Sequence, residues 1–176
     1  MKGCKAVFAV LFVVCFLSLS KSVFSQDSIP QKEPGYLAVS GGIYSCLDLW
    51  ASTGYVNVQF LPGKKLWVLQ PQVGALVTYL RTVMVYGGLT WPASPVKWLV
   101  IQTGAAAGYY ESGQGIDLAF PFEFRLTLSV LFKFRNYAQL GVEFAHISNA
   151  NISPPNPGTE SISLIFQLPL RKRKAY

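Results

Sequence analysis

The stretch Phe-Pro-Phe-Glu-Phe-Arg-Leu-Thr-Leu-Ser-Val-Leu-Phe-Lys-Phe-Arg (120–135) decides the fold. Its even-numbered positions are all large and apolar, whereas its odd-numbered positions are mostly polar or charged. Successive side chains of a β-strand point to opposite faces, so the stretch predicts a strand with one wholly apolar face. A soluble sandwich also shows alternation. Eight consecutive large apolar positions opposite charged ones fit better a barrel with lipid outside and a polar interior.

The polar face of this strand would carry Glu123, Arg125 and Lys133 into the barrel interior. A second acid, Glu143, falls on the interior face of the next strand by the same alternation. We expect Arg125 and Lys133 to pair with the two glutamates in a buried network that holds the interior closed.

Turn-forming residues divide the rest of the chain into similar segments. Leu37, Val39 and Ile43 oppose Tyr36, Ser40 and Tyr44, and the alternation returns in 55–60, whereas 66–79 and 96–108 have no clear phase. The turn signals fall at Leu47–Thr53, Pro62–Lys64, Leu80–Arg81, Pro92–Pro95, Glu111–Gly115, Arg135–Asn136 and Asn149–Thr159. Seven connections predict an all-β fold, an eight-stranded antiparallel transmembrane β-barrel.

An even number of strands leaves both termini on one side of the membrane, and short turns normally face the periplasm. We therefore expect the long loop 149–159 to face outward, at the level of the outer leaflet.

The first 25 residues predict a cleavable signal peptide. Lys2 and Lys5 precede an apolar stretch from Ala6 to Leu17, which is shorter than the about 20 residues of a spanning helix. An uncleaved N-terminal anchor is the alternative. The predicted organisation is thus a signal peptide over 1–25 and an outer-membrane barrel with a basic tail over 26–176.

Charge and cysteine content exclude several classes of function. Loss of residues 1–25 lowers the net charge from +7 by three lysines to +4, which equals the charge of the tail Arg171–Lys174. The body is balanced, so a nucleic-acid surface is not indicated. Cys46 is the one cysteine of the mature chain, and together with the single histidine it cannot build a typical zinc site. We expect no metal and no cofactor.

The single histidine, His146, lies near the end of the strand-like run 137–148. Alternation places it and Ser148 on the lipid-facing side with Ala138, Leu140, Val142 and Phe144. The following segment, starting at Glu160, puts that acid on its own apolar face with Ile162 and Leu164. Polar groups there are costly unless they bond to one another, and antiparallel neighbours lie about 5 Å apart.

A hydrogen-bonded chain of Ser148, His146 and Glu160 would have the logic of a hydrolase triad. His146 would take the proton from the Ser148 hydroxyl, and Glu160 would orient and stabilise the imidazolium. Polar residues at interfaces are also frequent without any catalytic role, and periodicity alone leaves both interpretations open.

The stretches His146-Ile147-Ser148-Asn149-Ala150 and Asn156-Pro157-Gly158-Thr159-Glu160 add a resemblance. Together they resemble the signature of the lipid A 3-O-deacylase family, outer-membrane esterases built as eight-stranded barrels. The resemblance extends to specific residues over about 25 positions near the C-terminus. Over the rest of the chain it concerns only the barrel architecture. The Pro154–Pro155 pair and the basic tail depart from the family pattern.

The resemblance implies catalytic roles for Ser148 as nucleophile, His146 as base and Glu160 as orienting acid. It further implies that Asn149, Asn156 and Gly158 shape the site and its oxyanion region and that Phe124 lines it. Purely structural interpretations remain open. Phe124 is one of several lipid-facing phenylalanines, and loop asparagines often form hydrogen bonds to the turn backbone. The substrate would be lipid A of lipopolysaccharide, among the lipids of the bacterial outer membrane, cleaved at its 3-O-linked acyl ester.

Two rival classes explain the alternation as well. One is a non-catalytic eight-stranded barrel with a structural or adhesive role, in which 149–159 is a binding loop. The other is a soluble lipocalin-like carrier, which would have a polar exterior. A homodimer is considered as a further partner, although the sequence leaves the oligomeric state open.

Overall fold

The computed structural model describes residues 34–48 and 50–170. The expected signal peptide, 1–25, and the basic tail Arg171–Lys174 lie outside the described residues. None of the described residues forms a helix that is long and apolar enough to cross a membrane.

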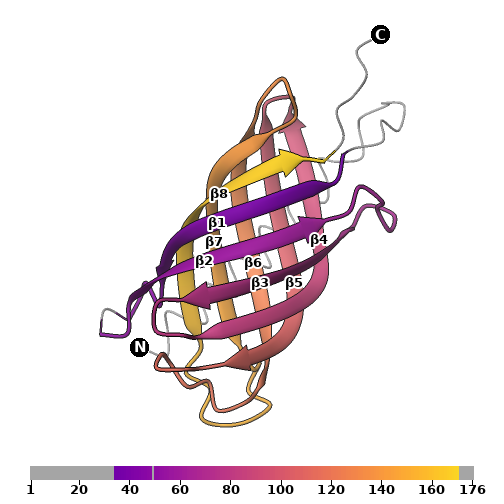
Figure 1. Cartoon of the computed structure of the whole chain (residues 1–176). Helices are drawn as coiled ribbons and strands as arrows, with labels where there is room; N and C mark the ends of the chain where they lie inside the picture. Colours follow the sequence, from indigo (N-terminus) through magenta and orange to yellow (C-terminus); the bar gives the residue numbers. More distant parts are fainter. Residues whose placement is uncertain (1–33, 49, 171–176) are drawn as a thin grey trace. The chain divides into compact units, whose positions relative to one another are not determined.

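Eight antiparallel strands close into a barrel in which each strand pairs with its sequence neighbours and β8 returns to β1 (Figure 1). The strands are β1 (Tyr36–Tyr44), β2 (Thr53–Leu61), β3 (Gln70–Thr78), β4 (Val83–Val96), β5 (Leu99–Glu111), β6 (Phe122–Lys133), β7 (Gln139–Ser148) and β8 (Thr159–Pro169). The predicted fold class is confirmed.

The barrel has two ends, for which we use two names. The terminal end is where β1 starts and β8 stops, and it carries the connections 62–69, 97–98 and 134–138. The distal end carries 45–52, 79–82, 112–121 and 149–158. The two longest connections, 112–121 and 149–158, are both at the distal end, and the second corresponds to the predicted loop 149–159.

Strand β6 shows why the alternation was informative. Glu123, Arg125 and Thr127 are buried, whereas Phe122, Phe124 and Leu126 are exposed on the outer face. The same two-residue period holds in β1 and β2. An apolar exterior around a polar interior is the arrangement expected for a barrel surrounded by lipid.

One predicted turn is wrong. Pro92–Pro95 lies within β4, which continues to Val96 and turns back at 97–98. The register between β4 and β5 shifts between Ala93 and Val96. A proline cannot donate a ladder hydrogen bond, and strands accommodate it where the pairing is irregular. Pro95 therefore lies in an irregular stretch of β4 and not in a chain reversal, and Pro92 pairs in register with Gln102 of β5.

The start of the seventh strand is also shifted from its prediction. The run was expected to begin at Tyr137 with Ala138 outward, but β7 begins at Gln139 and Ala138 is buried. Tyr137 has a φ of 68°, and the Ala138 carbonyl accepts a bond from the Phe134 N–H, so both residues belong to the turn. A turn has no two-residue period, and the alternation fails there.

The lumen holds a polar layer between two apolar clusters. The cluster toward the distal end includes Tyr44, Tyr86, Tyr110, Leu118 and Ile147. The cluster toward the terminal end consists of Tyr36, Ala38, Leu61, Val100, Leu131 and Ile165. Side chains thus fill the interior, as in other barrels of eight strands.

The polar layer is built around the buried ion pair of Arg125 and Glu143. An Arg125 guanidinium N–H donates to Glu143 Oε1 at 2.6 Å, and the Ser129 hydroxyl donates to Glu143 Oε2 at 3.2 Å. Arg125 also lies over the Tyr86 ring at 5.0 Å. This network was expected to include Lys133, but that residue lies at the terminal end of β6 and forms no ion pair with either glutamate among the described residues.

Candidate active site

The three predicted triad residues lie at the distal ends of β7 and β8. His146 and Glu160 are register partners across the two strands, and Ser148 follows two residues later on β7. Their neighbours Ala145, Ile147 and Ser161 are buried in the lumen, which places the three on the outer face. Strand pairing and alternation together bring them to one point on the lipid-facing surface.

A continuous hydrogen-bonded chain links the three side chains. His146 Nδ1 is 3.1 Å from Glu160 Oε1, and His146 Nε2 is 3.1 Å from Ser148 Oγ. The two ring nitrogens therefore face different partners, an acid on one side and a hydroxyl on the other. The exposed fractions of the His146 and Glu160 side chains are 33% and 15%, so the acid is the more shielded member. A carboxylate at Nδ1 holds the proton there and leaves Nε2 as a proton acceptor for the hydroxyl.

Asn149 and Asn156 fix the loop that covers this end of the two strands. The Asn149 backbone N–H donates to Asn156 Oδ1 at 3.3 Å, and the Asn149 amide group donates to the carbonyl oxygens of Leu118 and Ser153. Asn149 is completely buried. Its amide donors are used within the protein, so this side chain shapes the loop and ties it to the 112–121 connection.

Gly158 lies directly against the His146 imidazole. A Cβ placed on Gly158 would stand 3.1 Å from His146 Cε1, closer than nearly all real Cβ contacts. Its φ of 64° is in the left-handed region, where other residues are strained. Because glycine has no Cβ, the end of the loop can pack directly against the imidazole ring.

Phe124 is the register partner of Ser148 on the neighbouring strand β6. It lies on the outer face with an exposed fraction of 40%. Farther along, Phe122 makes edge contacts with Tyr109 of β5, with ring centroids 6.1 Å apart. An apolar aromatic surface therefore extends from the hydroxyl of Ser148 toward the distal rim.

Cys46, which the sequence showed only as a lone cysteine, lies in the connection after β1 and holds the backbone of Glu160. Its backbone N–H donates to the Glu160 carbonyl oxygen at 3.0 Å. Burial raises the pKa of the Cys46 thiol, and the negative charge of Glu160 raises it further. No local pattern could have identified this contact, because it forms only when β8 closes onto β1.

The trio lies apart from a pocket on the outer face of the barrel. A shallow depression of about 400 Å³ on the outer face is lined by residues of β1 to β3, among them Gly42, Gly54, Val56 and Val77. None of its lining residues belongs to the trio. Among the described residues, no group of three or more His, Cys, Asp or Glu side chains is arranged to hold a metal ion.

Comparisons with known proteins agree with this architecture. The family model described as lipid A 3-O-deacylase (PagL) matches residues 51–169. The crystal structure of the outer membrane enzyme PagL is 19% identical, with a TM-score of 0.56 over 77% of this chain and 99% of that one. A structure from the de novo design of transmembrane β-barrels is 13% identical, with a TM-score of 0.52 over 78% of this chain and 99% of that one.

None of the curated proteins compared with the sequence gives a significant match. The structural similarities, at these identities, support the fold alone. The family model spans most of the chain, including every residue of the trio and the loop between its strands. The chain therefore belongs to the lipid A 3-O-deacylase (PagL) family, whose members are β-barrels of the bacterial outer membrane.

Proposed function

We propose that this protein is a serine esterase that hydrolyses the 3-O-linked acyl ester of lipid A in the outer leaflet, with Ser148, His146 and Glu160 as its triad. The observation that carries the proposal is the chain of two 3.1 Å contacts on the outer face. A polar trio in a surface that is otherwise apolar is costly, and a structural barrel has no need for it.

The reaction divides into two proton-coupled steps. In the first, His146 Nε2 accepts the Ser148 proton while Oγ attacks the ester carbonyl, and the imidazolium then gives that proton to the departing 3-oxygen of the glucosamine. In the second, His146 activates a water that attacks the acyl-serine, which releases the 3-hydroxy fatty acid and restores Ser148. Glu160 stabilises the imidazolium in both steps.

Asn156 is the proposed side-chain donor to the oxyanion. Its Oδ1 accepts the Asn149 N–H, which orients the amide and leaves its nitrogen for another acceptor. Each such donor contributes about 10²–10³-fold to the rate of acyl transfer in known enzymes. In this proposal Asn149 positions Asn156 and does not itself contact the substrate.

The open, lipid-facing position of the trio suits a substrate that is already in the membrane. Lipid A lies in the outer leaflet with its acyl chains along the barrel wall, so the ester can reach Ser148 without leaving the bilayer. Phe124, opposite Ser148, offers an apolar surface for the chain beside the scissile bond.

The Ser148→Ala variant tests the proposal. The change should abolish release of 3-hydroxy fatty acid from lipid A, measured by mass spectrometry, while the barrel stays folded. Ser163→Ala is a matched control, because Ser163 lies on β8 with a buried side chain on the lumenal face. Full activity of Ser148→Ala would exclude the nucleophile assignment. Complete lack of activity in the unaltered, folded protein would favour the non-catalytic barrel.

A further inference from the structure

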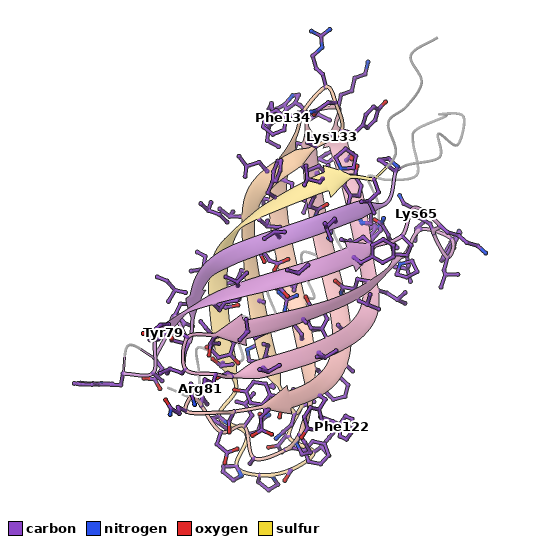
Figure 2. The ribbon with its side chains drawn as sticks, viewed as in Figure 1. Lys65, Tyr79, Arg81, Phe122, Lys133 and Phe134 are labelled. Carbon is purple, nitrogen blue, oxygen red and sulfur yellow. The ribbon has the colours of Figure 1, made fainter. Side chains whose placement is uncertain are left out.

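Charged side chains are divided between the two ends of the barrel. Within 34–48 and 50–170, every charged residue at the terminal end is basic, namely Lys64, Lys65, Lys97, Lys133 and Arg135. The distal end carries Asp48, Glu111, Asp117 and Glu160 with Arg81 as its one basic residue. Figure 2 shows Lys133 and Phe134 at one end of the barrel and Tyr79, Arg81 and Phe122 toward the other. The separation is a feature of the assembled barrel, because the residues come from connections spread along the chain.

Aromatic side chains at the terminal end indicate where these cations lie relative to the bilayer. Trp67, Trp98 and Phe134 are exposed there, and the Phe134 ring contacts Phe132 with centroids 5.0 Å apart. Exposed tryptophan rings at the edge of a membrane barrel lie at the level of the lipid headgroups. The neighbouring Lys97 and Arg135 are exposed in the turns themselves. Their charges are thus at the level of the phosphates.

We infer that the terminal end of the barrel is a binding surface for anionic phospholipid headgroups of the periplasmic leaflet. The leaflet follows from the short turns 97–98 and 134–138 at this end and from the two longest connections at the other. Four of the cations lie in three connections that alternate with strand pairs around the barrel, and Lys133 ends β6 beside the third, so they form a ring and not one pocket. Each lysine or arginine close to an anionic membrane surface raises the affinity by about fivefold.

The opposite end provides an internal control. Its acids repel anionic headgroups, so a preference for anionic lipid should be confined to the terminal end. Trp50, fully exposed in the 45–52 connection, reports on the distal end, and Trp67 and Trp98 report on the terminal end. The inference does not depend on the catalytic proposal, since none of the five cations lies at the trio.

The test uses the full chain folded into phosphatidylcholine vesicles that contain equal mole fractions of either brominated phosphatidylglycerol or brominated phosphatidylcholine. Bromine quenches nearby tryptophan fluorescence. In a Trp50→Phe/Trp91→Phe background, phosphatidylglycerol should quench several-fold more effectively than phosphatidylcholine. In a Trp67→Phe/Trp91→Phe/Trp98→Phe background the preference should vanish.

Neutralisation of the exposed cations sharpens the test. Lys64→Gln/Lys97→Gln/Arg135→Gln, which leaves Lys65 and Lys133, should lower the quenching ratio at the terminal end several-fold, whereas Asp48→Asn/Asp117→Asn should leave it unchanged. High salt should lower the quenching ratio of the protein that keeps all its cations, because salt screens their charges. This measurement tests the inference even if the charge variant folds poorly. Equal quenching by the two lipids, a ratio insensitive to charge and salt, or the same preference at the distal end would overturn the inference.

Discussion

Two polar clusters occupy opposite faces of the barrel wall and share strand β7, and their environments differ. Arg125 and Glu143 face the lumen with side chains only 1% exposed, and Gln59 and Ser129 add further contacts to the carboxylate. His146, on the same strand as Glu143, faces lipid with a third of its side chain exposed. One cluster is enclosed by protein, and the other is open to the surroundings of the barrel.

The difference indicates which cluster the fold requires. A closed lumen of this size must be filled, and its polar groups are satisfied by bonding to one another. The outer trio has no such role, because a wholly apolar surface would suit the lipid better. Changes in the lumen should therefore cost stability, and changes in the trio should cost activity.

The largest expected effect is from His146→Ala. Removal of the base leaves Ser148 without a proton acceptor, and loss of a triad base in serine hydrolases lowers kcat by about 10⁶-fold. Stability should be unchanged or slightly increased, because a polar ring leaves the lipid-facing surface. Fatty-acid release and denaturant unfolding of the same sample check both statements. An unfolded variant would show that the trio is structural after all.

Glu160→Gln should have the next largest effect. The amide keeps the shape of the side chain but loses the charge that stabilises the imidazolium, a change that costs about 10⁴-fold in other triads. Steady-state kinetics on lipid A should show the loss in kcat with the barrel intact. Activity equal to that of the unaltered protein would remove Glu160 from the triad and leave Ser148 and His146 as a pair.

Glu143→Gln, in the lumen, should cost stability and not activity. The change leaves the Arg125 guanidinium buried without its partner, and breaking a buried ion pair costs about 3–5 kcal/mol. Glu123→Gln is the matched control, because Glu123 is equally buried but neither of its carboxylate oxygens has a hydrogen-bond partner. Denaturant unfolding should show a loss for the first variant and no loss for the second. Equal losses would mean that the ion pair is not what stabilises the lumen.

The smallest of the four effects is expected for Gly158→Ala. The added methyl group would push on the imidazole at a position 3.1 Å from Cε1 and would strain a backbone with positive φ. Displacement of a catalytic group by about 1 Å costs about 10²-fold in rate. Gly54→Ala is the control, since a Cβ there meets no atom within 4 Å. An unaffected rate in Gly158→Ala would show that His146 tolerates the shift.

The sequence predicted the barrel where alternation is strong and failed where it is absent. Strands β1, β2 and β6 to β8 were recognised from their two-residue periods, with ends shifted by one or two residues. The Pro92–Pro95 error arose because a proline signals both turns and irregular strand edges, and only the pairing with β5 distinguishes them. The Lys133 error arose because alternation gives the face of a residue but not its distance from a partner.

For the candidate site, the sequence alone determined which reactive side chains are present and on which face of the strands they lie. The period of two sets the outward direction of His146, Ser148 and Glu160, because backbone geometry fixes it locally. Only the closed barrel decided the rest: the register that makes His146 and Glu160 partners, the bond from Cys46 to the Glu160 backbone, and the ring of cations at the terminal end. These depend on contacts between residues far apart in the chain, which no local pattern encodes.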